Sequence, residues 1–311
     1  RRLSAALLAI FFFTLGRGSV AADDVDMPPA PPAGRLLPGG TNTSKYLCVF
    51  GPQAEPAIGA TDSIHLLFLR VRRGTTSPVT IHVFDPGSRS RRELEVGDYV
   101  PTTTVFTVYG GEGAYTDPAA KAARPLPAQA GQKLAELTCR TEGRDAWVSL
   151  GSFEPGQGES VGDDVYFKVA AVATAGNSSN LFRVAVSPPS VEAFTYELSA
   201  NLTDSMCFYV DIPAGLNSVT EHNFDLDWGS SCYLGNLKLR RSRNGRWIEN
   251  AVDLPIEMQR RRLSYRITRV WRSYNNTAVY FTDPSGQALP IFFSAEVSER
   301  GPDVEAGAGH P

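Results

Sequence analysis

The sequence predicts an all-β protein built from two antiparallel β-sandwich domains. Short runs in which apolar and polar residues alternate recur along the chain, and this two-residue period is typical of strands that bury one face. Glycine, proline and asparagine separate these runs, and helical periodicity is almost absent. A length of 311 residues gives room for about two domains.

The longest pair of strands that this pattern predicts lies at residues 163–187. Val165, Phe167 and Val169 occupy alternate positions, and the same apolar spacing recurs over residues 182–186. Gly176 opens a short polar connection between the two runs. We therefore predict a long β-hairpin here, with one face of each strand in the core of the first domain.

Shorter strands precede and follow this hairpin, and their Val, Ile, Thr, Phe and Tyr content suits a half-buried pleated surface. Residues 64–71 and 79–84 are expected to form a second hairpin, whose rhythm resembles that of the first. An internal duplication would explain the likeness, and so would two hairpins packed in one sandwich. Asp117 followed by Pro118 predicts one short helix. The other expected strands are residues 45–50, 102–109, 146–150, 194–202, 207–212, 223–228, 237–241, 246–248, 263–271, 277–282 and 289–296.

Composition divides the chain into five parts. Two arginines, an apolar run and the small residues before Asp23 predict a signal peptide over residues 1–22. The expected parts after it are a Pro-rich linker over 23–44, a larger sandwich domain over 45–203, a smaller one over 204–297 and a flexible tail over 298–311. The apolar run is shorter than the roughly 20 residues of a membrane span, so we expect a secreted or periplasmic protein without a transmembrane segment after cleavage.

The cysteines are interpreted through this predicted export. Cys48, Cys139, Cys207 and Cys232 are even in number, and an oxidising compartment favours disulfides over metal thiolates. Three connectivities are possible. Pairing nearest neighbours would keep each bridge inside one of the two expected domains.

Catalytic and metal-binding motifs give little support for an enzyme. The chain has no Gly-x-Ser-x-Gly elbow and only four histidines. Asp163, Asp225 and Asp227 are weak candidates for structural calcium, because oxygen ligands can gather at strand ends, and no other cofactor is expected. Catalytic triads and carboxylate pairs are spatial arrangements, so a secreted hydrolase with a carboxylate- or His-based site remains an alternative.

The densest charge signal lies in the last third of the chain. Arginines flank the Asn244-Gly245 pair, which predicts a tight hairpin turn. Guanidinium groups bind anionic groups and aromatic rings stack on flat partners, so a glycan or an anionic polymer is the expected ligand. A solvated strand face is the competing interpretation, whereas a net charge of -3 gives no case for a specific nucleic-acid partner. The candidate ligand-binding residues are Arg241, Arg243, Arg246, Trp247, Tyr265 and Trp271.

Residues 158–169, Gly-Glu-Ser-Val-Gly-Asp-Asp-Val-Tyr-Phe-Lys-Val, followed by Asn-Leu-Phe-Arg-Val at 180–184, resemble the jelly-roll accessory modules of the pre-peptidase C-terminal type in bacterial secreted proteins. The resemblance implies jelly-roll-like sandwiches with a binding or stabilising role, and some such modules bind calcium. We therefore expect an exported, non-catalytic binding or scaffold protein. A structural subunit of a surface assembly, paired with another exported protein through edge strands, is a further alternative.

Overall fold

All described elements of the computed structural model are β-strands or single turns of 3-10 helix, which confirms the predicted all-β class. The structure describes residues 32–39, 45–56, 62–85, 100–122, 124, 129–139, 146–202, 204–226, 229–243, 245–259, 261–269 and 275–295. The expected signal peptide and tail lie outside these ranges. The 3-10 turns are η2 (Pro118–Lys121), η3 (Pro155–Gln157) and η4 (Ile256–Met258), and the first follows the predicted Asp117 cap, whose carboxylate accepts from the Ala119 amide at 2.9 Å.

Two large antiparallel sheets face each other across an apolar core. The ten-stranded sheet contains, in order, β17 (Trp247–Asp253), β14 (Ser218–Phe224), β19 (Asn275–Thr282), β12 (Glu197–Leu202), β2 (Lys45–Phe50), β10 (Ser179–Ser187), β4 (Val79–Asp85) and β7 (Ala146–Phe153), with β1 (Arg35–Leu37) beside β10 and β20 (Ala288–Leu289) beside β19.

The eleven-stranded sheet contains, in order, β16 (Leu237–Leu239), β15 (Ser230–Leu234), β18 (Arg262–Arg269), β13 (Met206–Asp211), β21 (Ile291–Phe292), β11 (Glu192–Thr195), β3 (Ile64–Arg72), β9 (Asp164–Ala175), β5 (Thr103–Gly110) and β6 (Gln132–Cys139), with β8 (Glu159–Val161) beside β9. β1 falls within the stretch that the sequence assigns to the linker.

The predicted long hairpin at residues 163–187 is wrong, because β9 and β10 belong to different sheets. β9 pairs with β3 and β5, whereas β10 pairs with β2 and β4. β3 and β4, the second expected hairpin, are separated in the same way. The predicted alternation is confirmed, since Phe167 and Val184 are both buried in the core between the sheets. Two strands that each bury one face can lie side by side or face to face, and the period of two is the same in both arrangements.

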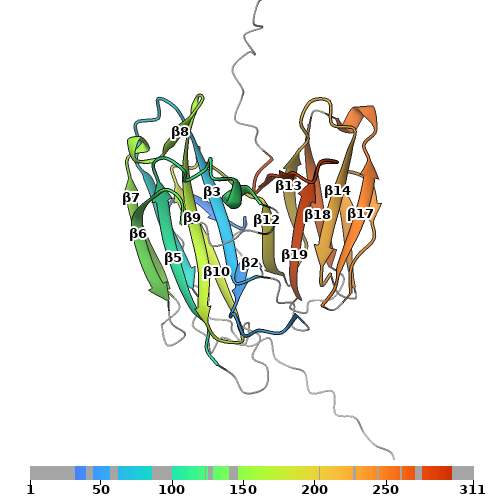
Figure 1. The fold of residues 1–311 in the computed structure, drawn as a ribbon, viewed down its shortest axis with the longest axis horizontal. Coiled ribbons are helices and arrows are strands. Elements are labelled where there is room, and N and C mark those ends of the chain that lie inside the picture. Colours follow the sequence, from blue (N-terminus) through green and yellow to red (C-terminus); the bar gives the residue numbers. More distant parts are fainter. Residues whose placement is uncertain are drawn as a thin grey trace, which may run out of the picture.

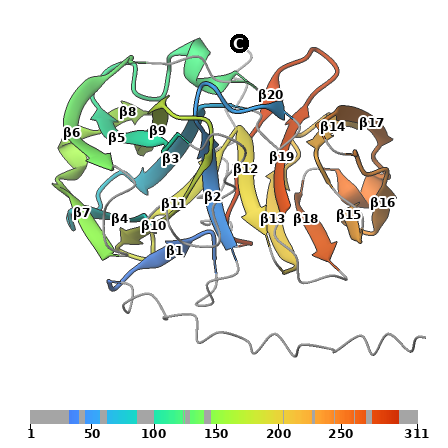
Figure 2. The same ribbon diagram turned by 90° about the horizontal axis from the view of Figure 1, so that it is seen from below.

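The order of strands is repeated in the two halves of the molecule. In the first half, residues 45–195, the sheets run β2-β10-β4-β7 and β11-β3-β9-β5-β6; in the second half, residues 197–292, they run β12-β19-β14-β17 and β21-β13-β18-β15-β16. The first strands of the halves, β2 and β12, pair with each other, and so do the last, β11 and β21. Both sheets therefore continue across the junction, where β2, β12 and β19 lie side by side (Figures 1 and 2).

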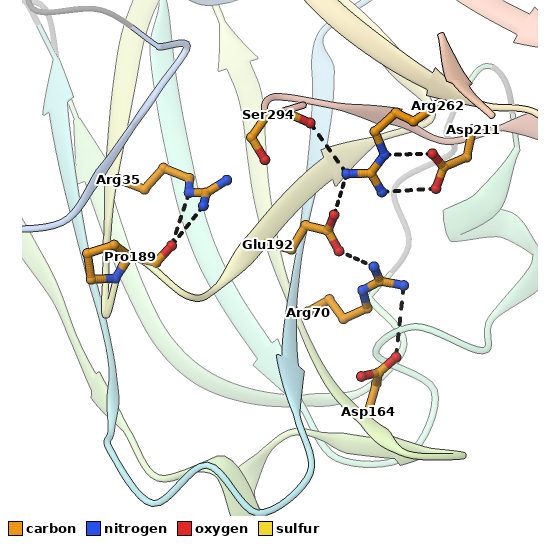
Figure 3. Close-up of polar contacts among 8 residues, drawn as sticks. All are labelled: Arg35, Arg70, Asp164, Pro189, Glu192, Asp211, Arg262 and Ser294. Atoms are coloured by element: carbon orange, nitrogen blue, oxygen red, sulfur yellow. Dashed lines mark hydrogen bonds and ion pairs between the residues drawn. The ribbon is translucent and has the colours of Figure 1, made fainter. Parts of the chain in front are cut away.

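A row of ion pairs crosses the junction on the outer face of the eleven-stranded sheet (Figure 3). Arg262 on β18 donates two hydrogen bonds to Asp211, of 2.6 and 2.9 Å, and a third of 2.5 Å to Glu192 on β11. Glu192 also pairs with Arg70 on β3, whose guanidinium lies 3.9 Å from Asp164. The side chains of Arg262 and Glu192 are only 3% and 5% exposed. These buried charges are paired, so they fasten the two halves together.

None of the four cysteines forms a disulfide in the structure, so the predicted disulfides are wrong. Cys207 and Cys232 lie on β13 and β15, with β18 between them. They pair with the neighbouring residues Arg266 and Ile267 of β18, and consecutive residues point to opposite faces. A bridge requires Cα atoms within about 7 Å and converging side chains. This pair satisfies neither condition.

The other expected pair is separated by the sandwich itself. Cys48 is buried on the outer face of the ten-stranded sheet, near Phe84, with its thiol 3.2 Å from the Ser199 hydroxyl. Cys139 is in the eleven-stranded sheet and packs against the core between the sheets. An even number of cysteines does not show which side of which sheet each thiol occupies.

Candidate functional site

Titratable side chains gather on the outer face of the ten-stranded sheet in the second half. Glu197 on β12 is opposite Tyr280 on β19, Tyr280 is opposite His222 on β14, and His222 is opposite Glu249 on β17. Cross-strand partners share a face of the sheet. One row across four strands therefore carries two carboxyl groups, an imidazole and a phenol.

Aromatic rings hold the middle of this row. The His222 ring stacks on Tyr280 with a centroid distance of 4.1 Å, and Trp247 lies 5.1 Å from Tyr280. His222 Nε2 is 3.2 Å from the Thr282 hydroxyl and Nδ1 is 3.6 Å from Glu249. Burial lowers the pKa of His222, and the nearby Glu249 carboxylate opposes that effect. Trp247 and Tyr280 are half-buried and Glu249 is exposed, so the row reaches the surface.

Two carboxyl groups lie at the end of the row nearest the junction. Glu197 is 6% exposed, and neither of its carboxyl oxygens has a hydrogen-bond partner among the described residues. Burial, and then the charge of Asp62, raise the pKa of Glu197 to about 8. Burial likewise raises the pKa of Asp62 to about 6, although its carboxylate accepts from the Ile64 amide at 3.1 Å.

A cation from the first half completes the site. Arg124, which follows η2, holds its guanidinium 5.5 Å from the centre of the Trp247 ring. Its positive charge lowers the pKa values of Asp62, Glu197 and Tyr280, which places it near all three groups. We call this set the acidic–aromatic cluster, and its members are Asp62, Arg124, Glu197, His222, Trp247, Glu249 and Tyr280.

A second polar set lies directly behind the cluster, on the core face of the same strands. Glu221 is fully buried and accepts hydrogen bonds from Tyr265 at 2.7 Å, from Asn250 at 2.7 Å and from Asn223 at 2.9 and 3.1 Å. Burial raises the pKa of Glu221, and these donors oppose the rise. Cys232 lies close by, and its pKa is raised to about 12 by burial and by the charge of Glu221. We call Glu221, Asn223, Cys232, Asn250 and Tyr265 the polar core network.

The polar core network fixes the chain that leads to Trp247. The amides of Asn223 and Asn250 donate to the Arg240 carbonyl at 3.0 and 2.9 Å, and the Ser242 amide donates to Asn223 at 2.7 Å. β16 and β17 lie in different sheets, so residues 240–243 and 245–246 belong to an arch between sheets and the predicted hairpin between these two strands is wrong. Asn244 itself lies outside the described residues. Because its backbone is hydrogen-bonded to buried side chains, this arch holds Trp247 in a defined place.

The structure separates the predicted ligand-binding residues. Arg243 and Arg246 are exposed on the arch, whereas Arg241 donates to the Leu226 carbonyl at 3.3 Å. Tyr265 is fully buried in the polar core network. Trp247 belongs to the acidic–aromatic cluster, and Trp271 lies outside the described residues.

The weak calcium candidates do not come together. Asp225 accepts a hydrogen bond of 2.9 Å from the Gly245 amide, and Asp163 is exposed beside the turn between β8 and β9. Asp227 lies outside the described residues. Within the described ranges, no group of three or more His, Cys, Asp or Glu side chains is arranged to hold a metal ion. A search of the same residues found no helix long and apolar enough to cross a membrane.

Sequence reasoning missed most of the acidic–aromatic cluster, because its members come from six separate segments of the chain. One local signal was present. The run Val219-Thr220-Glu221-His222-Asn223 places polar residues on both faces of a strand, which a half-buried strand tolerates only with partners on each side. A scan against protein-family models found no match, and a search of curated proteins found no relative.

Proposed function

We propose that the protein is an exported binding protein that takes a glycan at the acidic–aromatic cluster. The observation that carries the proposal is the pair of half-buried rings, Trp247 and Tyr280, with the carboxyl groups of Glu249 and Glu197 on either side of them. A sugar ring offers a flat C–H face to an aromatic ring and hydroxyl groups to carboxylates. Ligand sites commonly combine aromatic walls with a few placed polar groups in this way.

The architecture supports the same class of protein. We infer two β-sandwich domains of the jelly-roll type, with the larger over residues 45–203 and the smaller over 204–297. The support is the repeated strand order, in which a four-stranded sheet faces a five-stranded sheet in each half. That repeat begins again at β12, slightly before the sequence-based boundary. Secretion after removal of residues 1–22 belongs to the proposal, supported by the two arginines, the apolar run and the small residues before Asp23.

Calorimetric titration with neutral oligosaccharides, including gluco- and N-acetylglucosamine oligomers, tests the proposal. We expect at least one glycan to bind the wild-type chain, with Trp247→Ala weakening it more than tenfold and Tyr280→Ala less so. The matched control is Trp147→Ala, because Trp147 occupies β7 of the first half and packs on Phe84 at 5.5 Å, as Trp247 packs on Phe224 at 5.3 Å. Equal losses in both tryptophan variants, or no glycan binding at all, would count against it.

The salt dependence of binding distinguishes anion binding at the arch from glycan binding at the acidic–aromatic cluster. Binding of a sulfated polymer that weakens steeply with salt and disappears when Arg241, Arg243 and Arg246 are replaced by alanine would instead support the polyanion alternative. We expect glycan binding at the acidic–aromatic cluster to survive that triple replacement.

A second candidate function, glycoside hydrolysis, is favoured by one observation. Glu197 is a buried carboxyl whose pKa is raised to about 8, with Asp62 beside it. A neutral carboxylic acid next to a second carboxyl group is the pairing that glycosidases use as acid and base. Release of reducing sugar from the glycans that bind, abolished by Glu197→Gln, would establish this activity. Binding without release favours the non-catalytic function.

A further inference from the structure

The acidic–aromatic cluster holds more carboxyl groups than a neutral sugar needs. Asp62, Glu197 and Glu249 approach the Trp247–Tyr280 pair, and Arg124 is the cation that lies against them among the described residues. Sugar hydroxyl groups can satisfy carboxylates by hydrogen bonds alone. A cation adds a Coulomb attraction that grows as water is excluded, so this lining favours a positively charged ligand.

Glu197 is a buried carboxyl group that lacks a hydrogen-bond donor among the described residues. The carboxyl is nine-tenths buried, and neither oxygen has a hydrogen-bond partner among the described residues. A buried carboxyl group without a hydrogen-bond donor lowers the stability of the fold. Stability therefore does not explain why a glutamate occupies this position. By contrast, buried Glu221, on β14 of the same sheet with β19 between it and β12, has several donors. An ammonium group brought by a ligand would give Glu197 the hydrogen-bond donor that the described residues do not supply.

Arg124 shows which chemistry the site accepts. Its guanidinium lies over the Trp247 ring and close enough to Asp62 and Glu197 to lower both pKa values. Cations bind the faces of tryptophan rings in this way. Arg124 is exposed and comes from the segment after η2, outside both sheets. It therefore occupies the place of a ligand's cation without being part of the sheet that builds the site.

Resting on the proposed glycan-binding function, we propose that the ligand is an amino-sugar polymer with free amino groups. One pyranose ring lies against Trp247, and its ammonium group displaces the guanidinium of Arg124 to reach Glu197 and Asp62. The ammonium stabilises the ionised form of both carboxyl groups. A ligand whose amino groups are already protonated therefore releases the carboxyl protons on binding, whereas a neutral amine takes up such a proton itself. Glu249, His222 and Tyr280 face the same ligand, with Glu249 adding attraction at the exposed rim.

Titration of the full chain with a glucosamine oligomer and with the fully N-acetylated oligomer of the same length tests the proposal. We expect the glucosamine oligomer to bind about tenfold more tightly at pH 7. Titrations in two buffers of different ionisation enthalpy, at a pH below the pKa of the oligomer's amino groups, are expected to show proton release with the glucosamine oligomer only. Glu197→Gln removes the preference and the proton release, whereas Trp247→Ala weakens both oligomers. Arg124→Ala tightens the glucosamine oligomer severalfold, because the internal competitor is gone.

The outcomes separate the two proposals. Equal affinity for both oligomers, with both lost in Trp247→Ala, overturns the amino-sugar inference and leaves glycan binding standing. Failure of every glycan, together with Glu197-dependent binding of an oligolysine peptide, overturns both in favour of a basic protein partner. A preference that survives Glu197→Gln and Asp62→Asn also overturns the inference. Thermal unfolding checks that each variant is folded, and Asp62→Asn stands in if Glu197→Gln is not.

Discussion

The two halves of the molecule share one strand order and differ in what they bury. β4 in the first half presents Val79, Ile81 and Val83 to the core between the sheets. β14, which has the same place in the second half, presents Val219 and then the polar side chains Glu221 and Asn223. The backbone arrangement is therefore compatible with an apolar core and with a hydrogen-bonded one. What differs is that every polar group of the second core has to find a partner.

The outer faces of the ten-stranded sheet differ in the same way. In the first half, Trp147 packs on Phe84 beside a group that includes buried Tyr46, Phe50 and Leu181. In the second half, the tryptophan of the matching strand adjoins Tyr280 and a row of carboxyl groups. The second half therefore contributes most of the acidic–aromatic cluster, to which the first half adds Asp62 and Arg124.

The largest effect is expected from giving the second core the apolar chemistry of the first. Glu221→Val removes the acceptor of Tyr265, Asn223 and Asn250 and leaves three buried donors short of a partner. We expect a loss of about 3–5 kcal/mol in the free energy of unfolding, measured by urea denaturation. The reverse change, Val83→Glu, buries a carboxyl group without donors and should cost at least as much. A stable Glu221→Val variant would show that the polar core network does not support the second half.

The junction gives the next largest effect. Arg262→Met leaves Glu192 and Asp211 without their shared cation, for which we expect a loss of about 3 kcal/mol. Because this arginine bridges strands of both halves, we also expect calorimetric unfolding to broaden or split into two transitions. Arg266→Met on the same strand is the control, since Arg266 is exposed and its loss should change stability by less than about 1 kcal/mol. A single thermal transition at the wild-type temperature in Arg262→Met would contradict a stabilising role of Arg262 between the halves.

The pH dependence of stability should differ in sign between the halves. Burial lowers the pKa of His65, in the first core, from 6.5 to about 4. The unfolded chain binds this proton first, so stability is lost as pH falls from about 6.5 to 4. The pKa of Glu197 is raised from 4.5 to about 8. The folded chain holds that proton longer, so stability is lost as pH rises from about 4.5 to 8.

Two variants separate these two pH dependences of the free energy of unfolding. In the His65→Leu variant, the free energy of unfolding, measured with denaturant across pH 4–7, should no longer decrease toward acidic pH. The decrease expected for the wild-type chain is on the order of 2–3 kcal/mol. In the Glu197→Gln variant, the free energy of unfolding should no longer decrease as pH rises from 5 to 8, a decrease on the order of 3 kcal/mol in the wild-type chain. Each variant is the control for the other. Slopes that persist in both would assign the pH dependence to different groups, such as Glu221, whose pKa is also raised.

The smallest effect concerns the thiols. Cys207 is exposed, whereas Cys48 and Cys232 are buried and their pKa values are raised to about 12 by desolvation. Alkylation of the native protein, followed by mass spectrometry, should modify Cys207 quickly and leave those two unmodified until denaturation. We expect Cys207→Ser to change stability by less than about 0.5 kcal/mol. A bridged pair recovered from the folded protein would contradict the free thiols.

Strand positions could be predicted from the sequence, but strand partners could not. The alternation around Phe167 and Val184 correctly assigned both residues to buried faces. It gave no information on pairing, because β9 finds β3, about a hundred residues earlier, and not the strand that follows it. The Asn244-Gly245 signal failed for the same reason. A local turn preference of this kind is overridden when the flanking strands each gain more by pairing elsewhere.

The candidate site could be predicted only in fragments. Trp247 was singled out with the neighbouring arginines, and it does belong to the acidic–aromatic cluster. Glu197 and Tyr280 gave no signal, and His222 stood out only within the polar run at 219–223, since the three residues meet only through the cross-strand registers of β12, β19 and β14. The repeat of strand order between the halves gave no signal either. The duplication that the sequence suggested compares residues 64–84 with 163–187, which both lie in the first half, whereas the core residues Val83 and Glu221 on matching strands of the two halves have opposite chemistry.

The place of β2 between the halves has a consequence for how the chain is made. Leu47 of β2 pairs with Phe182 of β10 on one side and with Ala200 of β12 on the other. During synthesis, β2 leaves the ribosome long before either neighbour, and its second edge stays unpaired until the second half has begun to emerge. Such an edge invites pairing with other chains, and contacts this distant in sequence form slowly. We therefore expect fragments that end near Ser187 to need a chaperone, or to aggregate, whereas chains that continue past Leu202 cover this edge themselves.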